Sequence, residues 1–92
     1  MILEIVSPEA TLFKGEVTSV AVPGVNGEFE MLKDHAPIVS LLKAGHVKLY
    51  GENVQFEEEV EDRFTSEDRG YWLAINSGTI EMKDNKIIVL AD

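Results

Sequence analysis

Turn signals recur at short intervals along this chain and divide it into short segments. They are Ser7-Pro8, Lys14-Gly15, Pro23-Gly24, Asn26-Gly27, Ala44-Gly45, Gly51-Glu52, Ser77-Gly78 and Asp84-Asn85. Turns at this spacing are typical of antiparallel sandwiches and barrels. The sequence therefore predicts an all-β fold.

The segments between the turns show the alternation expected of half-buried strands. Hydrophobic and polar side chains alternate over residues 17–22, 46–50 and 79–83. The best helical candidate is Pro37–Lys43, but it is short and contains the β-branched pair Ile38-Val39. Because Ala44-Gly45 also stops it, we predict a strand there as well.

The length of 92 residues suffices for one domain, with no linker or internal repeat. A domain of this size buries roughly 60 to 70% of the surface of its unfolded chain. The longest apolar runs, such as Ile87–Ala91, are far shorter than the ~20 residues of a membrane-spanning helix. Glu4 interrupts the apolar start before a signal-peptide core forms, and the absence of cysteine excludes disulfides and thiolate metal sites. We expect a soluble, intracellular domain.

The net charge of −9 is concentrated in residues 52–69, where acidic residues outnumber Arg63 and Arg69. A negative surface repels phosphate backbones and anionic lipids. We therefore expect no nucleic-acid partner and no direct adhesion to a membrane. Any membrane association would depend on a protein partner.

Residues 52–69 are also the one segment without a clear period. A charged, solvated loop is the simplest interpretation. Val54 and Phe56 could extend the preceding strand, and Val60 and Phe64 have the spacing of a helical turn, so both alternatives stay open. A calcium site over residues 57–62 would lack the alternating ligands and the central glycine of a calcium loop.

No catalytic constellation stands out. His35 and His46 have no third ligand at metal-binding spacing, and Ser77 precedes a turn glycine without the nucleophile elbow of a hydrolase. The segment Gly24–Gly27 lacks the lysine and the helix of a phosphate-binding loop. A small hydrolase or metal-dependent enzyme is therefore the weakest interpretation, and we expect no cofactor and no metal.

The run from Pro23 to Pro37 contains two turn signals, a short apolar stretch and a histidine between an acid and Ala36-Pro37. The run contributes two motifs and four others accompany it, so that in chain order the six are Leu3–Glu9, Leu12–Val17, Pro23-Gly24 to Gly27-Glu28, His35-Ala36-Pro37, Leu42–Gly45 and Val89–Asp92. Together they resemble the epsilon subunit of F-type ATP synthases, called delta in mitochondria. The resemblance covers the chain from end to end apart from residues 52–69. It implies one domain over residues 1–92, a ten-stranded β-sandwich or flattened barrel of two five-stranded antiparallel sheets.

The resemblance also implies a function. The family's subunit is a non-catalytic rotor part at the foot of the central stalk, peripheral to the cytoplasmic side of the bacterial inner membrane. It docks on the gamma subunit and on the polar loops of the c-ring, so that ion-driven rotation reaches the catalytic head. On the family pattern, the expected c-ring contacts are Val25, Asn26, Gly27 and Glu28, and the expected gamma contacts are Ser7, His35, Ala36, Pro37 and Ser40. Glu28 would supply charge complementarity to the ring.

The chain departs from the family pattern in several places. Glu30 stands where the family usually has glycine, Lys33-Asp34 where it often has Pro-Gly, and residues 52–69 lengthen one hairpin. Many members continue after Leu-Ala-Asp into a C-terminal helical hairpin that inhibits ATP hydrolysis and in some binds ATP. This chain stops at Asp92, so we expect coupling without that brake and no ATP binding by this domain. The alternative is a free-standing acidic β-sandwich that binds other proteins.

Overall fold

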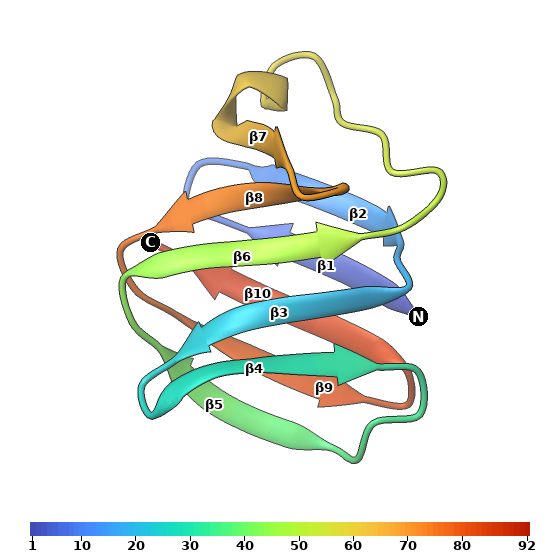
Figure 1. Ribbon diagram of the computed structural model, residues 1–92. Helices are drawn as coiled ribbons and strands as arrows, with labels where there is room; N and C mark the ends of the chain where they lie inside the picture. Colours follow the sequence, from blue (N-terminus) through green and yellow to red (C-terminus); the bar gives the residue numbers. More distant parts are fainter.

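The computed structural model describes residues 1–92 and contains ten strands and one 3-10 turn (Figure 1). The strands are β1 (Ile2–Val6), β2 (Thr11–Glu16), β3 (Ser19–Gly24), β4 (Gly27–Leu32), β5 (Ile38–Leu42), β6 (Gly45–Tyr50), β7 (Phe64–Glu67), β8 (Gly70–Ile75), β9 (Gly78–Lys83) and β10 (Lys86–Ala91). The 3-10 turn, η1, covers Glu61–Arg63. No helix has the length and apolarity needed to cross a membrane.

Strand pairing divides the fold into two sheets. One has the order β2-β1-β10-β9-β5 and the other β4-β3-β6-β8-β7, and a single residue pair, Gly24 with Leu42, connects them. In Figure 1 the second sheet lies in front of the first. The predicted all-β sandwich is thus confirmed, including the strand at β5, although the two sheets are continuous at one corner.

One pairing differs from the antiparallel prediction: β1 runs parallel to β10, with Ile2 opposite Lys86 and Val6 opposite Leu90. These are the first and last strands of the chain, so no hairpin loop joins them. Antiparallel direction is enforced only where a short loop connects two neighbouring strands. The turn signals of the sequence therefore carried no information about this pair.

The core lies between the two sheets and follows the alternation of the strands. In β3, Val20 and Val22 point inward and are fully buried, while Ala21 is buried but lies outside the core cluster. Twenty buried residues form that cluster, and half-buried side chains such as Phe29 and Ile38 pack against it. The sandwich is consequently held by apolar packing, without disulfides.

Residues 52–63, which we call the flap, cross the edge of the sandwich at β7 and β8 (Figure 1). The prediction of a charged, solvated loop holds for the outer side of the flap, where the acidic side chains are exposed. On its inner side, Val60 is buried and Val54 and Phe56 pack against the core. Residues 64–67 then form β7 and pair with β8, so the acidic segment adds an edge strand and does not prolong β6.

Phe56 fastens the flap. Its ring stacks on Phe64 with 4.1 Å between centroids, meets Tyr71 edge-on at 5.0 Å and lies 5.5 Å from Phe13. Aromatic pairs in this distance range stabilise beyond their buried area. One half-buried ring thus links the flap to β2, β7 and β8.

Substituting Phe56→Ala should lower the free energy of unfolding by about 2 kcal/mol, because three aromatic contacts and part of a buried ring are lost. Urea denaturation measures this change. Glu58→Ala, an exposed flap residue, is the matched control and should stay within about 0.5 kcal/mol of the parent. Equal free energies of unfolding for the two variants would show that the Phe56 ring does not anchor the flap.

Candidate docking interface

The β3–β4 hairpin presents the first predicted contact set. Val25 and Asn26 form its exposed turn, and Gly27 has a φ of +124°, which a residue with a Cβ adopts only under strain. The Val25 amide donates a hydrogen bond to the Leu41 carbonyl at 3.3 Å, and the Lys43 amide donates to the Pro23 carbonyl at 2.9 Å. The turn is therefore fixed against the end of β5.

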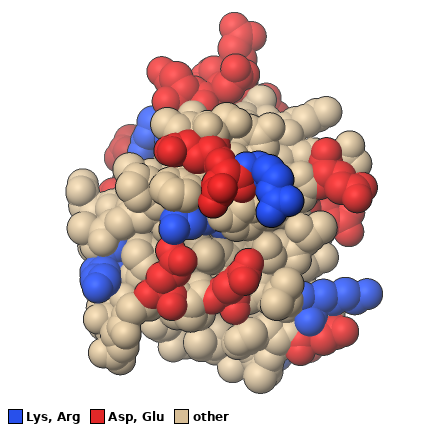
Figure 2. Space-filling view, in the orientation of Figure 1, with Lys and Arg blue, Asp and Glu red and all other residues tan.

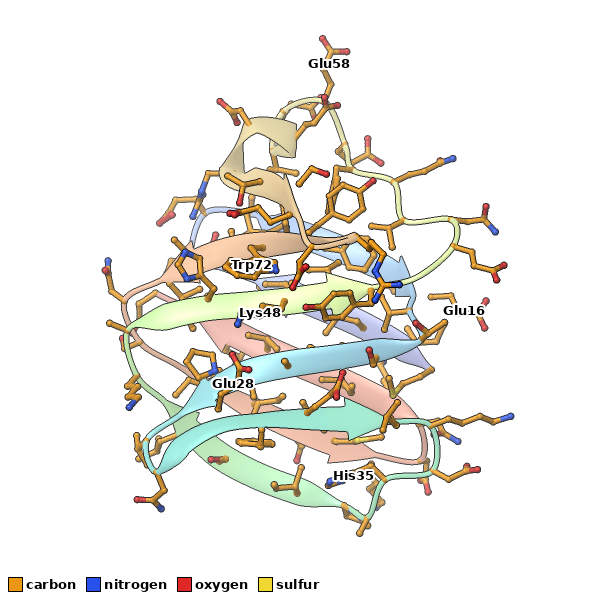
Figure 3. All side chains as sticks on the ribbon, in the orientation of Figure 1. Glu16, Glu28, His35, Lys48, Glu58 and Trp72 are labelled. Atoms are coloured by element: carbon orange, nitrogen blue, oxygen red, sulfur yellow. The ribbon has the colours of Figure 1, made fainter.

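Glu28, the predicted charged contact, is exposed but not unpaired. Its Oε1 lies 2.8 Å from the Nζ of Lys48, which also lies 4.3 Å from the centroid of the Trp72 ring (Figure 3). The hydrogen bond with Glu28 is the main reason why the pKa of Lys48 is raised above its ordinary value. Lys48 was not among the predicted contacts, because the pair joins β4 to β6 across an intervening strand.

His35, Ala36 and Pro37 lie at the opposite end of the sandwich from the β3–β4 turn (Figure 3). The loop that carries them is tied to the β9–β10 turn by two hydrogen bonds. The Asp34 amide donates to Oδ1 of Asn85 at 2.6 Å, and Nδ2 of Asn85 donates to Oδ1 of Asp34 at 2.9 Å. The histidine ring is half-buried, with Nδ1 2.7 Å from the Ala36 carbonyl oxygen.

Ser7 is separated from the other predicted gamma contacts. It follows β1, whose last residue Val6 pairs with Leu90, so it lies at the same end of the sandwich as the β3–β4 turn. Its hydroxyl donates to the Ala10 carbonyl at 3.2 Å and accepts from the Ala10 amide at 3.3 Å, which closes the β1–β2 turn. Ser40 lies in the middle of β5, and its hydroxyl donates to the Leu41 carbonyl at 3.2 Å. The predicted gamma contacts therefore do not form one cluster: they lie before β5, within β5 and, for Ser7, at the far end of the sandwich.

An apolar strip lies between the two ends and was missed by the sequence reasoning. It consists of Val39 and Leu41 on β5, which are 76% and 62% exposed, together with Leu90 on β10. Register places Thr79 of β9 between Leu41 and Leu90 in one row, so the strip spans three strands with a threonine at its centre. The signal was present, since β5 is apolar at four of its five positions although only one of its faces meets the core.

The strip lies away from the acidic flap, although exposed Glu81 on β9 is the cross-strand partner of Val39. β5 and β4 lie at one edge of the sandwich, whereas the acidic flap lies beside β7 at the other. Figure 2 shows the face of the β4-β3-β6-β8-β7 sheet, where acidic side chains project at the flap and acidic and basic side chains are interspersed below it; the strip belongs to the other sheet. A partner with an apolar face could therefore approach the strip without meeting the acidic cluster.

Asn85 connects the β9–β10 turn to the His35 loop and has a φ of +60°. Asn85→Gly should keep the turn but free the loop, because glycine adopts positive φ without strain yet offers no side-chain bonds. Amide hydrogen exchange of Asp34 should therefore accelerate several-fold. Asn85→Ala should in addition lose about 1 kcal/mol of stability from backbone strain. Unchanged Asp34 exchange in both variants would contradict this assignment.

The whole chain, residues 1–92, matches the family described as ATP synthase, Delta/Epsilon chain, beta-sandwich domain. It is 38% identical over 90 residues to the ATP synthase epsilon chains of Campylobacter concisus and Chlorobium limicola, which covers 98% of this chain in each case. The chain spans 59% of the Campylobacter protein and 86% of the Chlorobium protein.

A chain in a cryo-EM structure of the Tetrahymena thermophila mitochondrial ATP synthase central stalk and c-ring has the same fold. The TM-score is 0.68 over 99% of this chain and 62% of that chain, at 12% sequence identity. Fold and sequence agree, and membership in this subunit family is consistent with the expected lack of a catalytic role. The chain therefore belongs to the ATP synthase delta/epsilon family and comprises that family's β-sandwich domain.

Proposed function

We propose that this chain is a non-catalytic rotor part of an F-type ATP synthase, docked on the gamma subunit through the apolar strip and on the c-ring through the β3–β4 hairpin. The observation that carries the proposal is the exposure of Val39 and Leu41 side by side on one strand. Apolar side chains gathered on a surface mark an interaction site more reliably than scattered ones. Burial of such side chains provides most of the free energy of stable association.

The gamma contact would extend along β5 and the loop before it. His35, Ala36 and Pro37 lead directly into β5. Ser40 lies between Val39 and Leu41 in the strand, but its side chain points to the other face. That is the side of its buried partner Ile80, so Ser40 is not part of the strip. The strip would thus supply the apolar centre of the interface, and the loop would supply a polar rim. Ser7 lies outside this surface, and we assign it only a structural role in closing the β1–β2 turn.

The c-ring contact would be made by Val25, Asn26, Gly27 and Glu28. The hairpin is short, exposed and fixed to β5, which suits a part that must transmit force without yielding. Because the ring lies in the membrane, the chain would be peripheral to the cytoplasmic face of the bacterial inner membrane through this contact alone. Rotation of the ring, driven by ions, would then pass through the hairpin to β5 and on to gamma.

Co-purification tests the proposal. Tagged chain should retain the gamma subunit and the c-ring of its own synthase, whereas a free-standing interaction module would retain neither. Leu41→Asp should weaken gamma binding at least about tenfold, since a charge would be buried in the centre of the interface.

Leu32→Asp is the matched control. Leu32 is 58% exposed, close to the 62% of Leu41, but it lies on β4 in the other sheet. It should bind gamma like the parent chain. Parental binding by a folded Leu41→Asp variant would overturn the role of the strip.

A further inference from the structure

Lys48 reaches from β6 across β3 to Glu28 on β4, and a small residue makes this possible. Ala21 of β3 pairs with Lys48 on one side and with Glu30 on the other. It faces away from the core, like Glu28 and Lys48, because its neighbours Val20 and Val22 face inward. Ala21 is nevertheless only 6% exposed, as expected of a residue covered by longer side chains from both neighbouring strands.

Trp72 supports the lysine on the side away from Glu28. It is the direct cross-strand partner of Lys48 on β8, and Nζ lies 4.3 Å from its ring centroid. The His46 ring packs beside the indole at 5.4 Å. The ammonium is therefore held between a carboxylate and an aromatic face (Figure 3), and each contact restricts the lysine side chain further.

We propose that Lys48 is a positioning residue for the ring-facing hairpin: it holds Glu28 in one orientation and compensates its charge, so that the partner is recognised by hydrogen bonding. The partner group would be a neutral polar donor, such as an amide or hydroxyl. The identity of the partner rests on the function proposed above. The positioning itself rests only on contacts within this chain.

The chemistry of the carboxylate supports a neutral donor. Lys48 pairs with Oε1 of Glu28, and the carboxylate has a second oxygen, Oε2, on which this ion pair makes no demand. The remaining oxygen can accept a hydrogen bond from N–H or O–H. A cationic partner would have to compete with Lys48 for a charge that is already paired, and exposed pairs gain little from a second cation in water.

The alternative is direct charge complementarity, in which a free Glu28 attracts a cation on the ring. The two interpretations predict opposite signs for removal of the lysine charge. If Lys48 positions Glu28, Lys48→Met should weaken binding to the c-ring by about threefold to tenfold, the scale of one surface ion pair. If a cation binds Glu28, the same variant should bind more tightly, because the competing charge is gone.

Two variants complete the binding experiment, measured with the full chain and detergent-solubilised c-ring. Lys48→Arg keeps the charge and the stacking on Trp72 and should restore binding. Lys43→Met removes an exposed lysine at the same end of the sandwich and should leave binding unchanged. Tighter binding by Lys48→Met, or equal loss in Lys43→Met, would overturn the proposal.

A second measurement tests the positioning without any partner. The pKa of Lys48, followed by NMR of its side chain, should fall towards the ordinary lysine value in Glu28→Gln. Glu30→Gln is the control: it also removes a carboxylate from β4, at the position in register with Ala21 and Lys48, but it leaves the Glu28–Lys48 ion pair intact. It should change the pKa of Lys48 less, because the hydrogen bond with Glu28 remains and Glu30 is not among the groups that raise this pKa.

The two measurements separate the claims. Equal pKa changes in Glu28→Gln and Glu30→Gln would overturn the positioning role. A fall confined to Glu28→Gln, with no binding of the parent chain to the ring, would overturn the ring contact and support the positioning.

Discussion

The close approach of backbone at Gly24 is the constraint on which the two-sheet arrangement depends. A Cβ at this position would lie 2.8 Å from the Gly27 carbonyl oxygen and 2.8 Å from the Phe29 ring, closer than real Cβ atoms come. Glycine therefore lets β3 fold back onto β4 within two residues while Gly24 also pairs with Leu42 of β5. This single residue forms both the hairpin and the only pairing between the sheets.

Much of this fold was accessible from sequence because its information is local. Alternation predicted the strands around Val47 and Ile80, and turn dipeptides marked most of the connections. The Asp84-Asn85 turn, for example, has positive φ at both residues, which these residue types tolerate better than most. The parallel pairing of β1 with β10 was not accessible, since it joins the two ends of the chain and no local signal specifies it.

The candidate site shows the same division. The exposed turn at Val25 and Asn26 was predicted from the turn signals Pro23-Gly24 and Asn26-Gly27. The ion pair of Glu28 with Lys48 was not, because it depends on β4 and β6 flanking the same strand and on a small side chain between them. The flap was only half predicted: its charge was evident, but Phe56 anchors it through rings that come from three other parts of the chain.

The apolar strip and the hairpin are mechanically one unit. The Leu41 carbonyl accepts a hydrogen bond from the Val25 amide, while the Leu41 side chain forms part of the strip. The Pro23 carbonyl and the Lys43 amide add a second bond between the same two elements. Because backbone hydrogen bonds have narrow geometry, these two bonds tie the position of the turn to that of β5 without involving flexible side chains. If the hairpin and the strip bind different partners, as proposed above, the link between the two contacts is short and runs through the backbone.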